Sequence, residues 1–229
     1  MSLKQEPTAD GSQTLYSERY GQTFHSDKGA VTESKHVFLW ASGVTARLER
    51  SLTASILEVG FGTGLNFFLS ADLALKTETP MTFVSLEQSL LSSETVQGLG
   101  YEEGLEHPEL LTDYCQFRDA LGPEPGGKQV FKFKDVRLEL LLGEATEQNL
   151  GENRFDAIYQ DAFSPDANAE LWSETFFTKL LHALKPGGKL TTYSVKGEIR
   201  RRLKSLGFEV EKIPGPVGGK REMLRATKV

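Results

Sequence analysis

The sequence predicts an α/β fold of the Rossmann-like, doubly wound type. The expected sheet is mostly parallel and seven-stranded, with an antiparallel C-terminal strand and a small N-terminal embellishment. One observation is that apolar strand-like segments alternate with helical patterns along most of the chain. The other is a glycine-rich turn, Gly60-Phe61-Gly62-Thr63-Gly64, which joins one such strand directly to a helix.

The size and composition of the chain predict a single domain. The chain has 229 residues, 38% of them hydrophobic, which suffices for one sizeable core but not comfortably for two. Residues 1 to 13 are polar and include Pro7 and Gly11, so we expect a disordered tail there. Residues 14 to 229 then form one domain, in which residues 14 to 50 are an N-terminal extension.

Three classes of protein are disfavoured by what the sequence lacks. No run approaches the roughly 18 apolar residues of a membrane span, and the N-terminus has no apolar signal region, so a soluble, cytoplasmic protein is expected. The single cysteine, Cys115, allows no internal disulfide. The four histidines are scattered, so no metal site is expected.

The N-terminal extension contains two kinds of pattern. Residues 15 to 24 are expected to form two short extended pieces. Residues 31 to 48 carry apolar side chains at helical spacing, interrupted at Gly43. We interpret this part as a preamble to the central sheet.

The core elements follow in order, each predicted from its periodicity or its boundary residues. Strands at residues 55 to 59 and 81 to 87 flank a helix at 65 to 76, and helical patterns continue to about 117, with Pro108 at a helix start. The remaining elements are a hairpin of strands 129 to 134 and 136 to 142, strand 155 to 161, helix 173 to 184, strand 189 to 194, a basic helix 196 to 206, and strands 208 to 213 and 222 to 227. The short loop between the last two strands predicts the antiparallel end of the sheet.

The glycine-rich turn predicts a nucleotide-binding corner. A glycine has no Cβ, so it adopts positive φ and lets a ligand approach the backbone, and the N-terminus of the following helix favours an anionic group. The spacing is Gly-x-Gly-x-Gly, which differs from the Gly-x-Gly-x-x-Gly of dinucleotide-binding proteins. A plain strand-to-helix turn is the alternative that the turn alone leaves open.

The ends of four predicted strands carry matching chemistry. In open α/β sheets the ligand lies beyond the carboxyl ends of the strands. Glu87 ends the second strand, where a carboxylate can accept both hydroxyls of a ribose, and Glu144 is placed for the amino group of adenine. The candidate cofactor-binding residues are Glu58, Gly60, Gly62, Gly64, Asn66, Glu87, Gly143, Glu144, Ala145 and Asp161.

Charge is distributed unevenly along the chain. The net charge is −6, but residues 185 to 229 hold 12 Lys and Arg against 4 Asp and Glu, a local charge of +8. A localised basic face favours a polyanion even when the whole protein is acidic. The predicted phosphate contacts are Lys196, Arg200, Arg201, Arg202, Lys204, Lys220 and Arg221. An ordinary solvated basic face is the alternative.

The strand-end pattern resembles class I S-adenosylmethionine-dependent methyltransferases, and more closely the MnmC family. The resemblance spans residues 15 to 225 and rests on a set of short motifs. They are Ser26-Asp27-Lys28-Gly29, His36-Val37-Phe38-Leu39, the glycine turn to Asn66, Asp161-Ala162-Phe163-Ser164-Pro165, Glu170-Leu171-Trp172, Lys185-Pro186-Gly187-Gly188 and Gly219-Lys220-Arg221-Glu222-Met223-Leu224.

The resemblance implies a cofactor, a substrate and a partner. The cofactor is S-adenosyl-L-methionine, the substrate is the 5-aminomethyl group of 5-aminomethyl(-2-thio)uridine at the tRNA wobble position, and the partner is the tRNA anticodon region. Some family members carry a second, flavin-binding oxidoreductase domain. No such domain is recognised in this sequence, so methyl transfer is the only activity expected of it. A lysine that the family often has after Asp-Ala-Phe-Ser-Pro is absent, because residues 166 to 169 are Asp-Ala-Asn-Ala.

Three residues at or after the end of the predicted strand 155 to 161 have roles in this interpretation. Asp161 is the candidate catalytic residue, which orients the amine and accepts its proton directly or through water. Phe163 and Trp172 are candidates for stacking on an extruded base, because RNA readers act on unstacked loop bases. For both aromatic residues, packing in the core or the loop is the alternative.

Three other functions share parts of this pattern. An aminopropyltransferase also holds an amine near an aspartate at the position of Asp161. The basic segment 185 to 229, however, has no obvious use with a polyamine substrate. A nicotinamide-dependent oxidoreductase would need the dinucleotide fingerprint that this chain lacks. A non-catalytic tRNA-binding module is favoured only by the altered residues 166 to 169.

Overall fold

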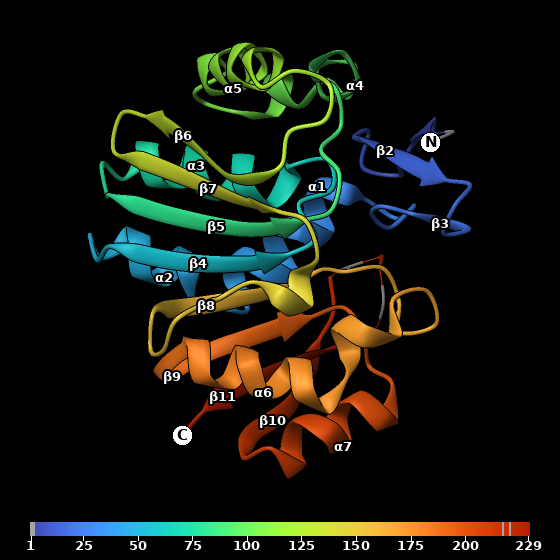
Figure 1. Cartoon of the computed structure of the whole chain (residues 1–229), viewed down its shortest axis with the longest axis vertical. Coiled ribbons are helices and arrows are strands. Elements are labelled where there is room, and N and C mark those ends of the chain that lie inside the picture. Colours follow the sequence, from blue (N-terminus) through green and yellow to red (C-terminus); the bar gives the residue numbers. More distant parts are fainter. Residues whose placement is uncertain (1–2, 217, 220) are drawn as a thin grey trace.

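A single eight-stranded sheet forms the centre of the molecule. The computed structural model describes residues 3 to 216, 218 to 219 and 221 to 229. The strand order is β10-β11-β9-β8-β4-β5-β7-β6 (Figure 1). The five parallel strands are β4 (Ala54–Val59), β5 (Met81–Glu87), β7 (Val136–Leu142), β8 (Phe155–Gln160) and β9 (Leu184–Thr192). The predicted Rossmann-like class is confirmed.

Both edges of the sheet end in antiparallel pairs. At one edge β11 (Glu222–Lys228) lies between β9 and β10 (Phe208–Pro214) and runs antiparallel to both, as predicted. At the other edge β6 (Gly127–Phe133) pairs antiparallel with β7 along its whole length. The predicted number of seven strands is therefore one too few, because the first arm of the predicted hairpin belongs to the central sheet.

The register of the parallel strands brings their carboxyl ends to one edge. Val59, the last residue of β4, lies opposite Leu86 of β5 and Gln160 of β8. Glu87, the last residue of β5, lies opposite Leu142 of β7. The segments that follow these four strands therefore begin side by side.

Helices cover the two faces of the sheet. Alternate residues of β4 point to opposite faces: Ile56 joins the core cluster that contains Phe67, and Leu57 joins the cluster that contains Phe177. The first cluster packs under α3 (Leu65–Lys76) and α5 (Glu109–Ala120), and the second under α6 (Glu174–Ala183) and α7 (Gly197–Ser205) (Figure 1). The short helix α4 (Ser93–Gln97) contacts α5.

The helix boundaries agree with the predictions to within a few residues. The side chain of Ser173 accepts a hydrogen bond from the Phe176 amide (3.1 Å) and so caps α6. The strand after α6 begins earlier than residue 189, because Leu184 already pairs with Phe155 and the pairing then shifts register before Ala157.

The N-terminal residues form a separate small sheet. Strands β1 (Leu3–Pro7), β2 (Gln13–Ser17) and β3 (Gln22–Thr23) pair antiparallel in that order. The expected disordered tail over residues 1 to 13 is thus wrong for residues 3 to 13. The turn between β1 and β2 is anchored by Asp10, which accepts a hydrogen bond from the Thr32 amide (2.9 Å).

Short helices link this sheet to the core. They are α1 (Ala30–Glu33), a π-helix at Ser34–Trp40 and α2 (Val44–Glu49). Gly43 precedes α2 with a φ of 84°, which accounts for the predicted interruption at this residue. The extension at residues 14 to 50 therefore contains both predicted kinds of element.

Within the described part of the chain, every helix is too short or too polar to cross a bilayer.

Glu139 is the centre of an ion-pair cluster on β7, and its replacement tests how charge stabilises the fold. Its side chain is only 7% exposed and pairs with Lys128 (2.9 Å), Arg137 (2.9 Å) and Arg154 (2.8 Å). Burial acts to raise its pKa, but the hydrogen bonds from these three cations lower the pKa to about 2. Because this pKa lies below the unfolded value, the stabilisation is complete above pH 4.5 and is lost as the pH falls toward 2.

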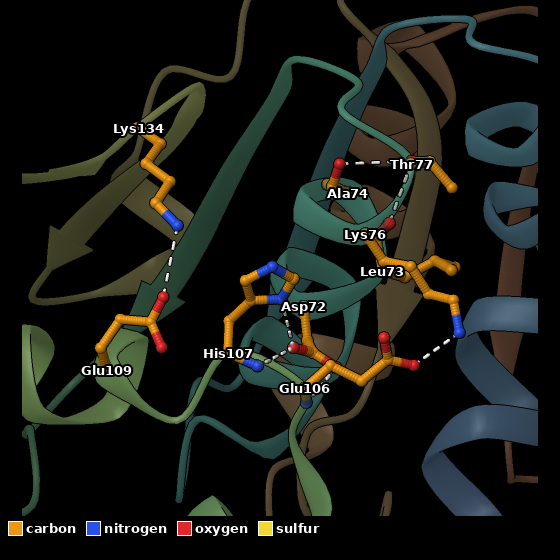
Figure 2. A network of polar contacts seen from close by, with 9 residues as sticks. All are labelled: Asp72, Leu73, Ala74, Lys76, Thr77, Glu106, His107, Glu109 and Lys134. Carbon is orange, nitrogen blue, oxygen red and sulfur yellow. Dashed lines mark hydrogen bonds and ion pairs between the residues drawn. The ribbon is translucent and has the colours of Figure 1, made fainter.

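Glu139→Gln is therefore expected to lower the free energy of unfolding at pH 7 by about 1 to 3 kcal/mol. The difference from wild type should shrink as the pH approaches 2 in urea titrations. Glu109→Gln is the matched control, because Glu109 pairs with Lys134 (3.3 Å) on the surface (Figure 2) and exposed pairs contribute little. A constant difference at all pH values would contradict this account.

A second polar network in Figure 2 ties α3 to the start of α5. The Asp72 carboxylate accepts hydrogen bonds from the Glu106 and His107 amides (3.2 and 2.9 Å) and contacts His107 Nδ1 (3.0 Å). Lys76 extends this network by pairing with Glu106 (2.5 Å). These contacts join α3, the helix that follows the glycine turn, to the segment just before α5 in the same helix layer.

Candidate cofactor and substrate site

A cavity of about 760 Å³ lies at the carboxyl edge of the central sheet. Its floor comes from the segments after β4, β5, β7 and β8, and its far wall from β2, β3 and the residues that follow them. The small N-terminal sheet lies beyond the ends of these central strands (Figure 1). Seven of the predicted cofactor-binding residues line the cavity: Gly60, Gly62, Glu87, Gly143, Glu144, Ala145 and Asp161.

The first two glycines of the turn lie in the cavity wall at positive φ, where a Cβ would crowd neighbouring protein atoms. Gly60 has a φ of 90°, and a Cβ there would lie 3.2 Å from the Asp161 carbonyl oxygen. Gly62 has a φ of 53°, and its Cβ would lie 2.9 Å from the ring of Phe24. Both residues line the cavity, so the turn brings bare backbone to the ligand space.

Gly64 lies at the start of α3, close to two aromatic rings. It precedes α3 with a φ of 79°, and a Cβ would lie 3.0 Å from both Phe61 and Phe68. Gly64 is absent from the cavity wall. The predicted cofactor contact of Gly64 stays a prediction, and the structure shows that aromatic rings lie on the side where its Cβ would be.

Glu87 is held against the glycine turn. One carboxylate oxygen accepts a hydrogen bond from the Gly62 amide (3.0 Å), and the other accepts from the Gln88 and Ser89 amides (2.8 and 2.9 Å). Burial raises the pKa of Glu87, although these backbone hydrogen bonds oppose the rise. Glu87, at the end of β5, and the glycine turn thus form one wall of the cavity, joined by hydrogen bonds.

The turn after β7 forms the adjoining wall. The Gly143 amide donates to the Glu87 carbonyl (2.9 Å), which continues the sheet pairing beyond the end of the strand. The exposed Glu144 side chain contacts Thr146, with 3.1 Å to its hydroxyl, at the start of a short 3-10 helix over Ala145–Glu147. The carboxylate of Glu144 therefore lies at the cavity rim.

Glu58 and Asn66 lie behind the cavity wall. They are 1% and 2% exposed, respectively, and neither lines the cavity, so direct cofactor contact is wrong for both. Glu58 accepts hydrogen bonds from Asn66 Nδ2 (3.0 Å) and from the Ser85 hydroxyl (2.8 Å). Burial raises the pKa of Glu58 to about 8.

Asp161 lies where the β8 loop meets the glycine turn. It lines the cavity, and its Oδ2 accepts a hydrogen bond from Asn66 Nδ2 (2.8 Å). Tyr193 and Glu33 line the same cavity. Burial, followed by the charges of Asp161 and Glu33, raises the pKa of Tyr193. The Tyr193 hydroxyl donates to the Ala162 carbonyl (2.8 Å), which fixes its ring beside Asp161.

Of the two aromatic residues predicted to stack on a base, Phe163 lines the cavity and Trp172 does not. Phe163 lines the cavity, where it stacks on Tyr20 (4.2 Å between centroids) and meets Phe24 edge-on (5.1 Å). Trp172 is fully buried, and its indole Nε1 donates to the Phe163 carbonyl (2.8 Å). The prediction that Trp172 stacks on a base is therefore wrong, because helix α6 and the sheet enclose its ring.

The N-terminal sheet is fastened to the Asp161 loop. The Gln22 amide nitrogen lies 2.7 Å from the Ser164 hydroxyl, and the Ser164 amide donates to the Gln22 side-chain oxygen (3.2 Å). These contacts explain how Tyr20 and Phe24 reach the cavity from a segment predicted only as extended. Tyr20, Phe24, Glu33 and Tyr193 were missed as site residues, because their sequence neighbourhood has no recognisable ligand motif.

The predicted basic patch is only partly available to a partner. Lys196 pairs with Asp166 (2.6 Å), and Arg202 donates to the Trp172 carbonyl, so these two side chains hold protein groups. Arg200, Arg201 and Lys204 of α7 lack an ion-pair partner among the described residues, and Arg221 is exposed. We call Arg200, Arg201 and Lys204 the α7 basic face. Lys220 lies outside the described residues.

The cavity itself is acidic. No Lys or Arg of the described chain lines it. Its seven carboxylate side chains are Glu6, Asp27, Glu33, Glu87, Glu144, Asp161 and Glu170. Such a wall attracts cationic ligands and disfavours a pyrophosphate. In the part of the chain that the structure describes, no cluster of three His, Cys, Asp or Glu side chains is arranged to hold a metal ion.

Comparisons with known proteins agree with this geometry. The model of a family described as S-adenosyl-L-methionine-dependent methyltransferase matches residues 115 to 229. A solved structure of MnmC2 from Aquifex aeolicus superposes with a TM-score of 0.77 at 28% identity, covering 98% of this chain and 70% of that one.

Curated relatives include two bifunctional MnmC proteins of tRNA 5-methylaminomethyl-2-thiouridine biosynthesis. The one from Cupriavidus metallidurans is 37% identical over 95% of this chain and 33% of its own length. The one from Actinobacillus pleuropneumoniae is 32% identical over 94% of this chain and 34% of its own length. This chain thus spans about a third of these relatives. On the family match, the fold and the glycine-turn cavity, the chain belongs to the S-adenosyl-L-methionine-dependent methyltransferase family.

Proposed function

We propose that this chain transfers a methyl group to the aminomethyl nitrogen of 5-aminomethyl(-2-thio)uridine at the wobble position of tRNA. The observation that carries the proposal is the acidic cavity, which has seven carboxylates and, among the described residues, no cationic side chain. The cofactor of the family carries a sulfonium and an alkylamine is an ammonium at neutral pH, so both ligands are cations. A tRNA substrate also implies a cytoplasmic protein.

The strand-end walls suit S-adenosyl-L-methionine. Gly60 and Gly62 leave the cavity floor without side chains, and the Glu87 carboxylate is oriented beside them for ribose hydroxyls. Glu144 and Ala145 lie on the adjoining wall, in reach of an adenine. When bound, the cofactor supplies the methyl group on a sulfonium, whose C–S bond breaks as the new N–C bond forms.

The other half of the cavity suits the amine. An alkylammonium has a reference pKa of about 10.4 and no lone pair, so it must lose a proton before it attacks. Asp161 lies in the cavity wall and is the group that orients the nitrogen and accepts this proton. Glu33 and Tyr193 complete the wall around that position and would hold the ammonium before its proton leaves.

The partner follows from the outer surface and from the relatives. The relatives are named for biosynthesis of a modified tRNA nucleoside. The helix that carries the α7 basic face begins beside the Asp161 loop, because Lys196, its N-cap residue, pairs with Asp166 of that loop. Phosphates of an anticodon stem would lie on this face while the wobble base enters the cavity.

The cavity by itself would also suit an aminopropyltransferase with a cationic polyamine. The α7 basic face favours tRNA over that alternative, because a polyamine would be repelled by it. The acidic cavity is unsuited to a nicotinamide dinucleotide, whose pyrophosphate is an anion.

The direct test is a methyl-transfer assay. The protein is incubated with labelled S-adenosyl-L-methionine and tRNA bearing 5-aminomethyluridine, and the tRNA is digested to nucleosides. We expect label in a product one methyl group heavier than 5-aminomethyluridine, and none with tRNA that has unmodified uridine at this position. Label in another nucleoside, or none at all, would refute the proposed substrate.

Charge reversal on α7 tests the RNA surface. Arg201→Glu is expected to weaken tRNA binding and to reduce the slope of log affinity against log salt by about one. Lys132→Glu is the control, because Lys132 is exposed on β6, at the opposite edge of the sheet from β10, which α7 contacts. Filter-binding titrations at several salt concentrations measure both. Equal losses in the two variants would place the RNA elsewhere.

A further inference from the structure

A single buried amide joins two carboxylates behind the cavity. Asn66, the second residue of α3, is 2% exposed. Its Nδ2 donates to Glu58 Oε1 (3.0 Å) and to Asp161 Oδ2 (2.8 Å). A side-chain amide nitrogen carries two hydrogens, so both of its donors are engaged by acids.

Glu58 sets the direction of this amide. It lies on β4, is 1% exposed, and its second oxygen accepts a hydrogen bond from the Ser85 hydroxyl (2.8 Å). When Glu58 is ionised, both carboxylates receive the nitrogen of Asn66, since the opposite orientation would set its oxygen against two acceptors. The amide therefore has one allowed orientation when Glu58 is ionised.

Asn66 also carries a polar atom that the fold does not satisfy. Its Oδ1 is buried and lacks a hydrogen-bond partner in the described structure. Buried polar atoms without partners are rare in folded proteins, and each calls for a compensating reason. The reason that the geometry offers is the hydrogen bond to Asp161, the one residue of this chain of contacts that lines the cavity.

We propose that Asn66, oriented by Glu58, is a positioning residue that holds the Asp161 carboxylate in the rotamer that meets the substrate amine. The inference rests on the proposed function, in which Asp161 accepts the proton of the amine. Asn66 does not touch the reacting atoms. It acts by keeping one oxygen of Asp161 engaged, so that the carboxylate cannot turn away from the cavity.

A double-mutant cycle in single-turnover methyl transfer tests this role. Asn66→Ala is expected to lower the rate at saturating cofactor and tRNA by tenfold or more, with a smaller change in either KM. In an Asp161→Asn background the same replacement should change the rate less than twofold, because the group it positions no longer accepts a proton. Independent, multiplicative effects of the two replacements would overturn the proposal.

Two further variants separate positioning from packing. Ser70→Ala is the matched control, because Ser70 is also buried on α3, one turn later, and its hydroxyl lies 3.4 Å from that of Tyr159. It should keep the wild-type rate, and a loss equal to that of Asn66→Ala would reveal a general effect on α3. Glu58→Gln keeps an oxygen for the Asn66 amide and is expected to retain most activity, whereas Glu58→Ala should behave like Asn66→Ala.

Failure of the proposed function is distinguishable from failure of this inference. A wild-type protein that leaves 5-aminomethyluridine unmethylated refutes the function. In that case crystal structures of the wild type and of Asn66→Ser, which is too short to bridge both acids, give the answer. A changed Asp161 rotamer in the variant supports positioning, and an unchanged rotamer overturns it.

Discussion

The Asp161→Asn enzyme is expected to transfer methyl groups about 10²- to 10⁴-fold more slowly than the wild type. The replacement keeps the size of the side chain, and its oxygen can still accept the hydrogen bond from Asn66 that Asp161 accepts now (2.8 Å). Its amide nitrogen would then face the amine, and an amide does not accept a proton. Rates are measured in single turnovers with 5-aminomethyluridine tRNA.

Cofactor binding separates a chemical effect from a collapsed site. The dissociation constant of S-adenosyl-L-methionine, from calorimetry, should change much less than the rate, since the cradle of Gly60, Gly62 and Glu87 stays intact. Asp113→Asn is the control, because Asp113 is exposed on α5 and does not line the cavity. An Asp161→Asn enzyme with wild-type activity would remove Asp161 from the mechanism.

Trp172→Ala is expected to destabilise the protein by about 3 to 5 kcal/mol. The indole is fully buried, meets Phe177 and Tyr193 edge-on (6.2 Å for each pair of centroids), and donates a hydrogen bond to the Phe163 carbonyl. Its removal leaves a large cavity and an unsatisfied carbonyl beside the Asp161 loop. Urea unfolding followed by circular dichroism gives the free energy.

The second tryptophan of the chain provides the comparison. Trp40 is 53% exposed and its ring lies tilted against that of His36 (4.8 Å between centroids), so Trp40→Ala should change stability by about 0.5 kcal/mol or less. If Trp172 bound a base, as its sequence position suggested, Trp172→Ala would raise the KM for tRNA and leave stability unchanged. That outcome would contradict the structural assignment.

Much of the site was predictable because strand ends are set by local pattern. Each of four strands is an apolar run with a distinct end: three of them precede Gly60, Gly143 and Asp161, and the fourth ends at Glu87. Parallel pairing brings these ends to one edge of the sheet. All seven residues of the cavity floor named above come from these four ends. The antiparallel pair of β10 and β11 was predictable for the same reason, from two runs and a short loop.

The misassignments concern residues whose role depends on their neighbours in space. Glu58 directly precedes the glycine motif, yet its side chain is buried. Asn66 is next to the same motif and lies behind the wall. The strand Leu3–Pro7 is polar and was therefore expected to be disordered. It is ordered because it pairs with β2, and amino-acid composition alone does not predict that pairing.

The sequence by itself determined the fold class, the family and the edge of the sheet where ligands bind. These properties follow from periodicity and from short motifs, and both are local. Only the tertiary structure decided which charges remain available and which aromatic rings are accessible: Lys196 and Arg202 are engaged by protein groups, whereas Phe163 lines the cavity and Trp172 is buried. Burial and ion pairing depend on contacts between segments that are distant in the chain. They therefore cannot be predicted from the sequence of one segment alone.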